Sequence, residues 1–199
     1  MHIMLMATAG LQQALFGIGM SFGLTSGEAG PQGLSGTMQA RLEEIASRLC
    51  RRGGGEDKFL RQVMYWWDVK APRYWWAEAD TYKIGTTAQS ESTMHRLTGR
   101  PLTQGDFERP ISLLHLALLN KAITEFNESR GDASSFMQLK NELPEGFLQR
   151  RIWSLSLAGM KNIFAQRRKH KLPQWRTVCQ AFYEATPEFL RGMYAEARA

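Results

Sequence analysis

The chain has 199 residues, of which 43% are hydrophobic and 22% charged, which is the composition of an ordinary globular protein. This length suffices for one well-buried domain, so we expect a single domain over residues 1–199. The formal charge of +6 and the pI near 9.5 are compatible with an anionic partner, whether nucleotide, nucleic acid or acidic surface, but do not indicate a fold.

The cysteines and the apolar N-terminal stretch bear on three further features: a metal site, a membrane span and a signal peptide. Cys50 and Cys179 form no CxxC pair and have no nearby histidine, so we expect no metal site and a reducing, cytoplasmic location. Residues 1–24 are largely apolar, but no Lys or Arg precedes the apolar part, and two glutamines and four glycines interrupt it. We therefore expect no membrane span and no signal peptide, and predict that this stretch is buried in the core.

The N-terminal part of the chain predicts a strand over residues 1–9, then a short helix or turn over residues 10–21. A Gly/Pro/Ser-rich loop is expected over residues 23–36. Residues 37–52 carry apolar side chains at spacings of three and four, which predicts an amphipathic helix. Aromatic and β-branched residues predict a strand over residues 63–69.

A polar segment follows the second predicted strand. Pro72 suits the first turn of an aromatic helix that we expect to run to about Tyr82. The rest of the stretch up to His95 is rich in Thr, Gln and Ser and has almost no apolar residue. Such a loop is either a ligand site, because hydroxyl and amide groups are short donors and acceptors, or a solvated connector.

The C-terminal half predicts helices. The first covers residues 103–130, with Asp106 as its N-cap and Pro110 near its first turn. A second is expected over residues 147–168 and a third from Pro173. We therefore predict an α+β fold, with several long helices and a small mixed or antiparallel sheet.

A run of positive charge spans residues 150–171 without a single Asp or Glu. We interpret it as one cationic helical face, which is either an anion-binding site or a solvated surface. Its members are Arg150, Arg151, Lys161, Arg167, Arg168, Lys169 and Lys171.

The polar segment resembles a motif of the flavin-dependent thymidylate synthases (the ThyX family), R-H-R-x-x-S-x-N-E-x-S-x-R-Y, which also follows a strand, an Ala-Pro-like step and an aromatic helix. Leu143-Pro144, Trp153 and the later Gln174-Trp175-Arg176 are similar to the C-terminal half of that family. The aligned motif positions are Thr87 on the first Ser, Gln89 on Asn, Ser90 on Glu, Ser92 on the second Ser, Met94 on Arg, His95 on Tyr, and Tyr82-Lys83-Ile84 on R-H-R.

The resemblance implies an α+β homotetramer that binds FAD between subunits and deoxyuridylate (dUMP) with its phosphate on arginines. NADPH and a folate one-carbon donor are implied by the family only. It assigns catalytic roles to Ser92 and His95, although a lone loop histidine is more often a simple hydrogen-bonding residue. It further implies cofactor binding by Lys83, Thr87, Gln89 and Ser90, and substrate binding by Ser92, Arg167 and Arg176.

The departures from the motif leave two hypotheses. Tyr82, Ile84 and Met94 remove planar cations that bind phosphate bidentately, and Lys83 is no equivalent. The first hypothesis is a diverged, ThyX-like enzyme that methylates or hydroxymethylates a deoxyuridine nucleotide by reductive one-carbon transfer. The alternative is a non-catalytic protein that binds nucleotide or nucleic acid through residues 150–171.

Overall fold

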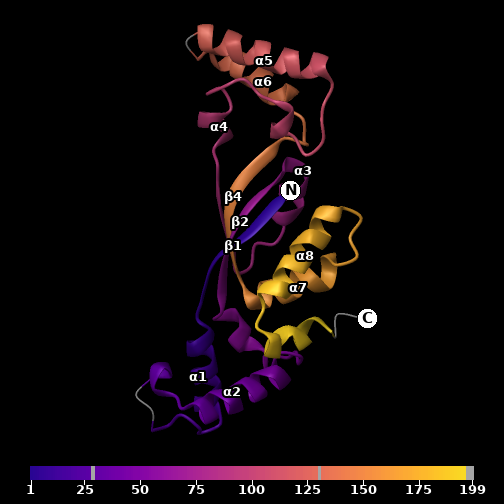
Figure 1. The fold of residues 1–199 in the computed structure, drawn as a ribbon. Helices are drawn as coiled ribbons and strands as arrows, with labels where there is room; N and C mark the ends of the chain where they lie inside the picture. The colour runs from indigo at the N-terminus through magenta and orange to yellow at the C-terminus, as the bar shows by residue number, and fades with distance from the viewer. Residues whose placement is uncertain (28–29, 130, 196–199) are drawn as a thin grey trace. The chain divides into compact units, whose positions relative to one another are not determined.

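The structure is a computed structural model that describes residues 1–27, 30–129 and 131–195 (Figure 1). Residues 28 and 29 of the predicted loop, and Arg130 at the end of a predicted helix, lie outside this range. The strands are β1 (His2–Ala9), β2 (Met64–Pro72), β3 (Thr86–Ser90) and β4 (Leu148–Ser156). The α-helices are α1 (Leu11–Ser21), α2 (Gly36–Leu49), α3 (Arg73–Ala79), α4 (Thr93–Arg96), α5 (Leu113–Glu128), α6 (Ala133–Glu142), α7 (Leu157–Arg167) and α8 (Pro173–Ala185).

The four strands form one antiparallel sheet in the order β1-β2-β4-β3. Its register follows from backbone bonds at the strand ends. The Arg73 N–H donates to the Phe147 carbonyl at one end of the β2–β4 pair, and the Leu157 N–H donates to the Val63 carbonyl at the other. Residue numbers rise along β2 while they fall along β4, so the pair is antiparallel. The expected α+β class with a small sheet is confirmed.

The chain divides into two compact units. The first contains residues 1–2, 69–82 and 89–152; the second contains residues 3–68, 83–88 and the described residues from Trp153 onward. Strands β2 and β4 contribute residues to both. The expectation of a single domain stays a prediction.

The first unit has its core between the helical hairpin α5–α6 and the chain that precedes it (Figure 1). Helix α5 begins after Ser112, whose hydroxyl accepts a hydrogen bond from the His115 N–H at 3.1 Å. Such a cap satisfies one of the free donors of a helix start. The buried core residues are Leu97, Leu102, Phe107, Leu119, Ile123, Leu139 and Leu143.

The second unit is built on aromatic packing between the sheet and helices α7 and α8, which lie side by side (Figure 1). The Phe182 ring of α8 lies 5.3 Å from the Trp67 ring of β2 and 6.0 Å from the Trp153 ring of β4. Large aromatic side chains bury more apolar area than any other type, so these contacts fix helix α8 on its strands.

Two helix predictions in the C-terminal half are wrong. The helix expected over residues 147–168 is strand β4 followed by α7, because residues 148–156 pair with β2 and β3 in the sheet and a helix begins only at Leu157. The helix expected from residue 103 starts at Leu113, because Asp106 instead caps a short 3₁₀ turn (Gln104–Asp106). Helix α6 was not expected.

The prediction for the N-terminal stretch is also wrong in part. Helix α1 is partly buried, with Ala14 and Leu15 at most 1% exposed. Strand β1, however, is mostly exposed along its length. The prediction that residues 1–24 are buried in the core is therefore wrong for the strand, because β1 lies at an edge of the sheet and has only β2 as a neighbour.

Candidate functional site

The polar segment is not a loop: its first part is strand β3 at the edge of the sheet opposite β1. Thr87, Gln89 and Ser90 are exposed on this strand. Because side chains alternate along a strand, Thr87 and Gln89 share one face and Ser90 lies on the other. The Ser154 hydroxyl of β4 donates to the Thr87 carbonyl at 3.3 Å. The strand was missed because an exposed edge strand with polar side chains on both faces has no hydrophobic period.

Ser92 and His95 lie just beyond β3, at the short helix α4. The Ser92 hydroxyl caps α4 by accepting a hydrogen bond from the Met94 N–H at 3.2 Å. A serine hydroxyl that accepts one bond keeps its proton as a donor, so Ser92 can also contact a ligand. His95 is exposed on α4. The catalytic assignment of these two residues stays a prediction.

Sequence reasoning missed Lys140, which the fold brings to the same segment. The Lys140 ammonium, on α6, donates to the Thr93 hydroxyl at 2.7 Å. In the part of the chain that the structure describes, Lys140 has no carboxylate partner. Partial burial, and then the positive charge of Arg73, lower the pKa of Lys140. A half-buried ammonium without a counter-charge is a favourable place for an anion.

In another polar cluster of the first unit, the hydrogen-bonding groups are paired with one another. The Arg151 guanidinium lies 4.3 Å from the centre of the Trp76 ring and donates to both carboxylate oxygens of Asp80 at 2.8 and 3.1 Å. It also donates to the Gln149 side-chain oxygen at 2.9 and 3.1 Å. The Trp76 indole N–H donates to the Gln149 carbonyl at 2.9 Å. This cluster ties α3 to β4 and leaves Arg151 committed to protein contacts.

The triplet aligned with R-H-R lies between α3 and β3. Lys83 is exposed, and Ile84 is 95% exposed. An isoleucine with almost its whole side chain in water contributes little to the core, and a single exposed apolar side chain is common on protein surfaces. The only side-chain cation of the triplet is Lys83, which is a single point charge.

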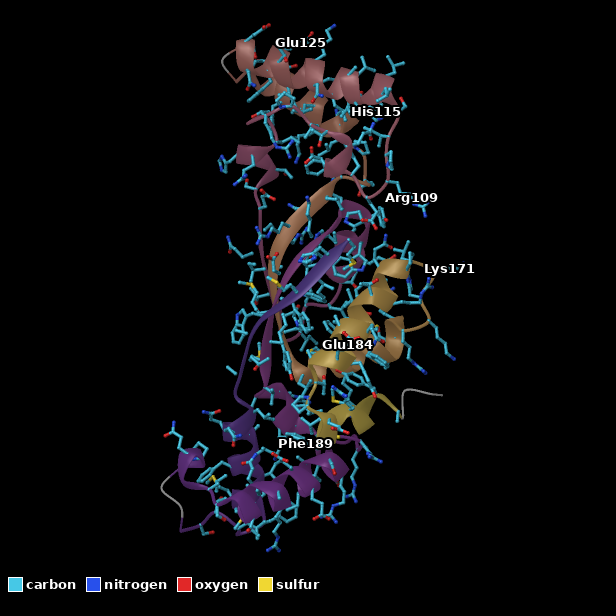
Figure 2. The ribbon with its side chains drawn as sticks, viewed as in Figure 1. Arg109, His115, Glu125, Lys171, Glu184 and Phe189 are labelled. Atoms are coloured by element: carbon cyan, nitrogen blue, oxygen red, sulfur yellow. The ribbon has the colours of Figure 1, made fainter. Side chains whose placement is uncertain are left out.

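Arg167 and Arg176 come together at the connection between α7 and α8, which we call the α7–α8 corner and define by residues 167–171 and Arg176. The Arg167 guanidinium lies 5.0 Å from the centre of the Trp175 ring. Arg176 donates to the His170 carbonyl at 3.3 Å. Lys169 and Lys171 are exposed, and Figure 2 labels Lys171 at this connection.

The basic run is therefore not one helical face. Arg150 and Arg151 lie on strand β4 and belong to the first unit, whereas α7 and the α7–α8 corner belong to the second. Lys161 of α7 is committed as well, since its ammonium donates to the Asp57 carboxylate and the Cys50 carbonyl, both at 2.8 Å. The exposed lysines of the run, Lys169 and Lys171, lie in the α7–α8 corner.

The described residues form neither a metal-binding cluster nor a membrane-spanning helix. Among residues 1–27, 30–129 and 131–195, no three His, Cys, Asp or Glu side chains are grouped so that they could hold a metal ion. Over the same residues, no helix has the length and apolar character needed to cross a bilayer.

Comparison with known proteins identifies the class of fold. No protein-family model and no curated protein sequence matches the chain. Solved structures do match, and they show that the chain has a ThyX-like fold.

Two of these structures are of one enzyme, the flavin-dependent thymidylate synthase ThyX from Helicobacter pylori, with FAD and dUMP. One matches with a TM-score of 0.73 at 14% identity, the other with 0.74 at 13%. Each match covers 99% of both chains. The expected ThyX-like fold is thus confirmed over 99% of the chain.

Proposed function

We propose that this chain is a flavin-dependent, thymidylate synthase-like enzyme that transfers a one-carbon group reductively to a deoxyuridine nucleotide. The observation that carries the proposal is the Lys140–Thr93 contact, in which an ammonium with no carboxylate partner among the described residues meets the residue that follows Ser92 on a ThyX-like scaffold. The H. pylori enzyme with this fold binds FAD and dUMP.

The residues present fit a phosphate-bearing ligand. The motif arginines are replaced by Tyr82, Ile84 and Met94, which offer phosphate no charge. Lys140 supplies a cation that offsets part of this loss. A charge-assisted hydrogen bond contributes about 1.5–3 kcal/mol, so a contact with the half-buried Lys140 would supply a measurable part of the affinity for a phosphate group.

The remaining roles follow from the kinds of donor available. Thr87, Gln89 and Ser90 supply neutral donors and acceptors for a flavin ribityl chain or a base edge. Ser92 and His95 carry the hydroxyl and imidazole groups that are proposed to act on the substrate. Arg167 and Arg176 provide further cations for substrate phosphate. The flavin, when bound, supplies the reducing equivalents; NADPH and a folate donor remain family expectations.

The first test asks whether the purified protein binds flavin. Added FAD and FMN are titrated while the visible spectrum and flavin fluorescence are recorded. Bound flavin with a shifted spectrum is expected. A colourless protein that takes up neither flavin would refute the assignment.

The second test asks whether phosphate recognition depends on Lys140. We expect Lys140→Met to weaken dUMP binding about 10- to 100-fold, the equivalent of one charge-assisted hydrogen bond, and to leave deoxyuridine binding unchanged. The matched control is Lys121→Met on exposed α5, where the lysine forms an ordinary surface ion pair with Glu125 at 3.5 Å. Equal loss in both variants contradicts a specific phosphate contact.

The α7–α8 corner supports a second candidate function, binding of nucleic acid. No Asp or Glu occurs over residues 146–183, so the exposed Lys169 and Lys171 have no acidic neighbour along the chain. Binding of single-stranded DNA or RNA would then fall steeply with salt, because each phosphate contact releases a counterion. Binding that is absent at 50 mM salt, or insensitive to salt, contradicts this candidate.

A further inference from the structure

The Lys140 ammonium is held at its end by a hydroxyl from a distant segment. Thr93, the first residue of α4, accepts its hydrogen bond at 2.7 Å. The two residues are 47 positions apart in the sequence, so this contact joins α6 to the polar segment. Within the part of the chain that the structure describes, Lys140 has no other hydrogen-bond or ion-pair partner. The direction of its side chain therefore depends on Thr93.

Both ends of this contact are anchored in the first unit. On α4, the Ser92 hydroxyl accepts a hydrogen bond from the Met94 N–H at 3.2 Å, which fixes the turn that carries Thr93. On α6, Lys140 follows Leu139, which is fully buried in the core of this unit. The Thr93 hydroxyl therefore lies at a defined place relative to the base of the Lys140 side chain.

The neighbouring cation is occupied by protein groups. The Arg73 guanidinium lies 3.0 Å from the Glu145 carboxylate and donates to the Leu143 carbonyl at 3.1 Å. After partial burial, the charge of Arg73 is the second cause that lowers the pKa of Lys140. Arg73 is thus committed to protein contacts, whereas Lys140 contacts a neutral hydroxyl. Lys140 is the cation of this pair that can bind a phosphate group.

A neutral hydroxyl is suited to orient an ammonium that must also bind an anion. An ammonium has three N–H donors, so the bond to Thr93 leaves two for a ligand. A carboxylate in the place of Thr93 would neutralise the charge that attracts a phosphate. An apolar side chain there would leave the flexible lysine free to move, and ordering it on binding costs affinity because rotamer freedom is then lost.

We propose that Thr93 is a positioning residue, whose hydroxyl holds the Lys140 ammonium in the direction in which it binds a phosphate group. This role rests on the proposed function, because it concerns the same site. In the motif alignment, Thr93 falls on a position without a preferred residue, between Ser92 and Met94. Because Thr93 acts through Lys140, its removal should weaken phosphate binding by less than removal of Lys140.

The first test compares Thr93→Val, which removes the hydroxyl at nearly constant shape, with Thr93→Ser, which keeps it. Calorimetric titration should show dUMP binding weakened about 3- to 10-fold in Thr93→Val and less than about 2-fold in Thr93→Ser. Deoxyuridine, which has no phosphate, should bind equally to both. The matched control is Thr124→Val on α5, where the hydroxyl donates to the Asn120 carbonyl of the same helix at 3.1 Å. This control should bind dUMP like wild type, and urea unfolding verifies that each variant is folded.

A double-mutant cycle shows whether Thr93 acts through Lys140. In the Lys140→Met background, Thr93→Val should have no further effect on dUMP affinity, because no ammonium is left to position. Effects of the two substitutions that multiply in full overturn the proposal. Equal losses in Thr93→Val and Thr124→Val, or a Thr93→Ser variant that binds as weakly as Thr93→Val, overturn it as well.

Chemical labelling separates this role from the proposed function. Acetylation by acetic anhydride, followed by mass spectrometry, measures the reactivity of Lys140 without nucleotide or flavin. A hydrogen bond from the ammonium favours its charged, unreactive form, so Lys140 should be acetylated faster in Thr93→Val than in wild type. Inorganic phosphate should protect Lys140 in wild type and Thr93→Ser, and less in Thr93→Val.

The outcomes are distinguishable. A wild-type protein that binds neither flavin nor dUMP refutes the proposed function, while protection by inorganic phosphate still tests Thr93. Equal protection of Lys140 in wild type and Thr93→Val overturns the positioning role, even where dUMP binds.

Discussion

The Asp106 carboxylate is the best-defined buried charge in the first unit, and its removal has a predictable cost. Asp106 is 8% exposed. Arg100 donates to its carboxylate at 2.9 Å, and the Thr103 N–H and hydroxyl donate to it at 2.7 and 3.1 Å. These bonds fix the turn that leads from Leu97 to Phe107 in the core of this unit. Asp106→Asn keeps the shape and removes the charge.

The expected loss in free energy of unfolding follows from the shift in the pKa of the Asp106 carboxyl. The hydrogen bond from Arg100 is the main cause that lowers the pKa of Asp106 from 3.8 to about 2. A shift of roughly two units corresponds to about 2.5 kcal/mol. The Arg100 side chain is 59% exposed, so solvent screening reduces the expected contribution to about 1–2 kcal/mol.

The sign of the pH dependence is fixed by the direction of this shift. A carboxyl whose pKa is lower in the folded state stabilises the fold fully above its unfolded pKa, near pH 4, and loses this contribution as the pH falls towards 2. Urea unfolding should show Asp106→Asn less stable by about 1–2 kcal/mol at pH 7. The difference from wild type should shrink between pH 4 and pH 2.

An exposed ion pair of helix α5 provides the control. Glu125→Gln breaks an exposed ion pair with Lys121 and should cost less than about 0.5 kcal/mol. If Asp106→Asn costs no more than this control at pH 7, or if its difference from wild type is constant from pH 7 to pH 2, the carboxylate does not stabilise the fold as argued.

Two further predictions concern the second unit. Lys161→Met removes the partner of Asp57 and should lower the free energy of unfolding by about 2–4 kcal/mol. Lys169→Met on the exposed corner should change it by less than about 0.5 kcal/mol. Equal effects of the two substitutions in urea unfolding contradict a stabilising role for the Lys161–Asp57 contact. Gly10→Ala should cost about 2–3 kcal/mol, because Gly10 has φ = 90° and an added Cβ would collide with the Gln62 carbonyl. A thermal melting temperature for Gly10→Ala equal to that of wild type contradicts the strain argument.

Local sequence patterns were enough for much of the fold. The period of three and four over residues 37–52 predicted α2, and the aromatic, β-branched run predicted β2. Both patterns depend on residues that are neighbours in the sequence, so a short stretch of sequence is enough to identify each element. The motif in the polar segment and the pattern near Leu143 pointed to the ThyX-like fold although only 13–14% of residues are identical to the matched structures.

The sequence alone determined the α+β class, the position of the polar segment and the excess of positive charge. Only the tertiary structure decided that residues 148–156 form a strand, because a strand needs hydrogen-bonding neighbours that lie elsewhere in the chain. The same holds for Lys140, which meets Thr93 across 47 positions of sequence, and for β1, whose apolar side chains remain exposed because the sheet ends there. Hydrophobic period is local, whereas strand pairing, burial and the loss of water around a charge depend on contacts between distant residues.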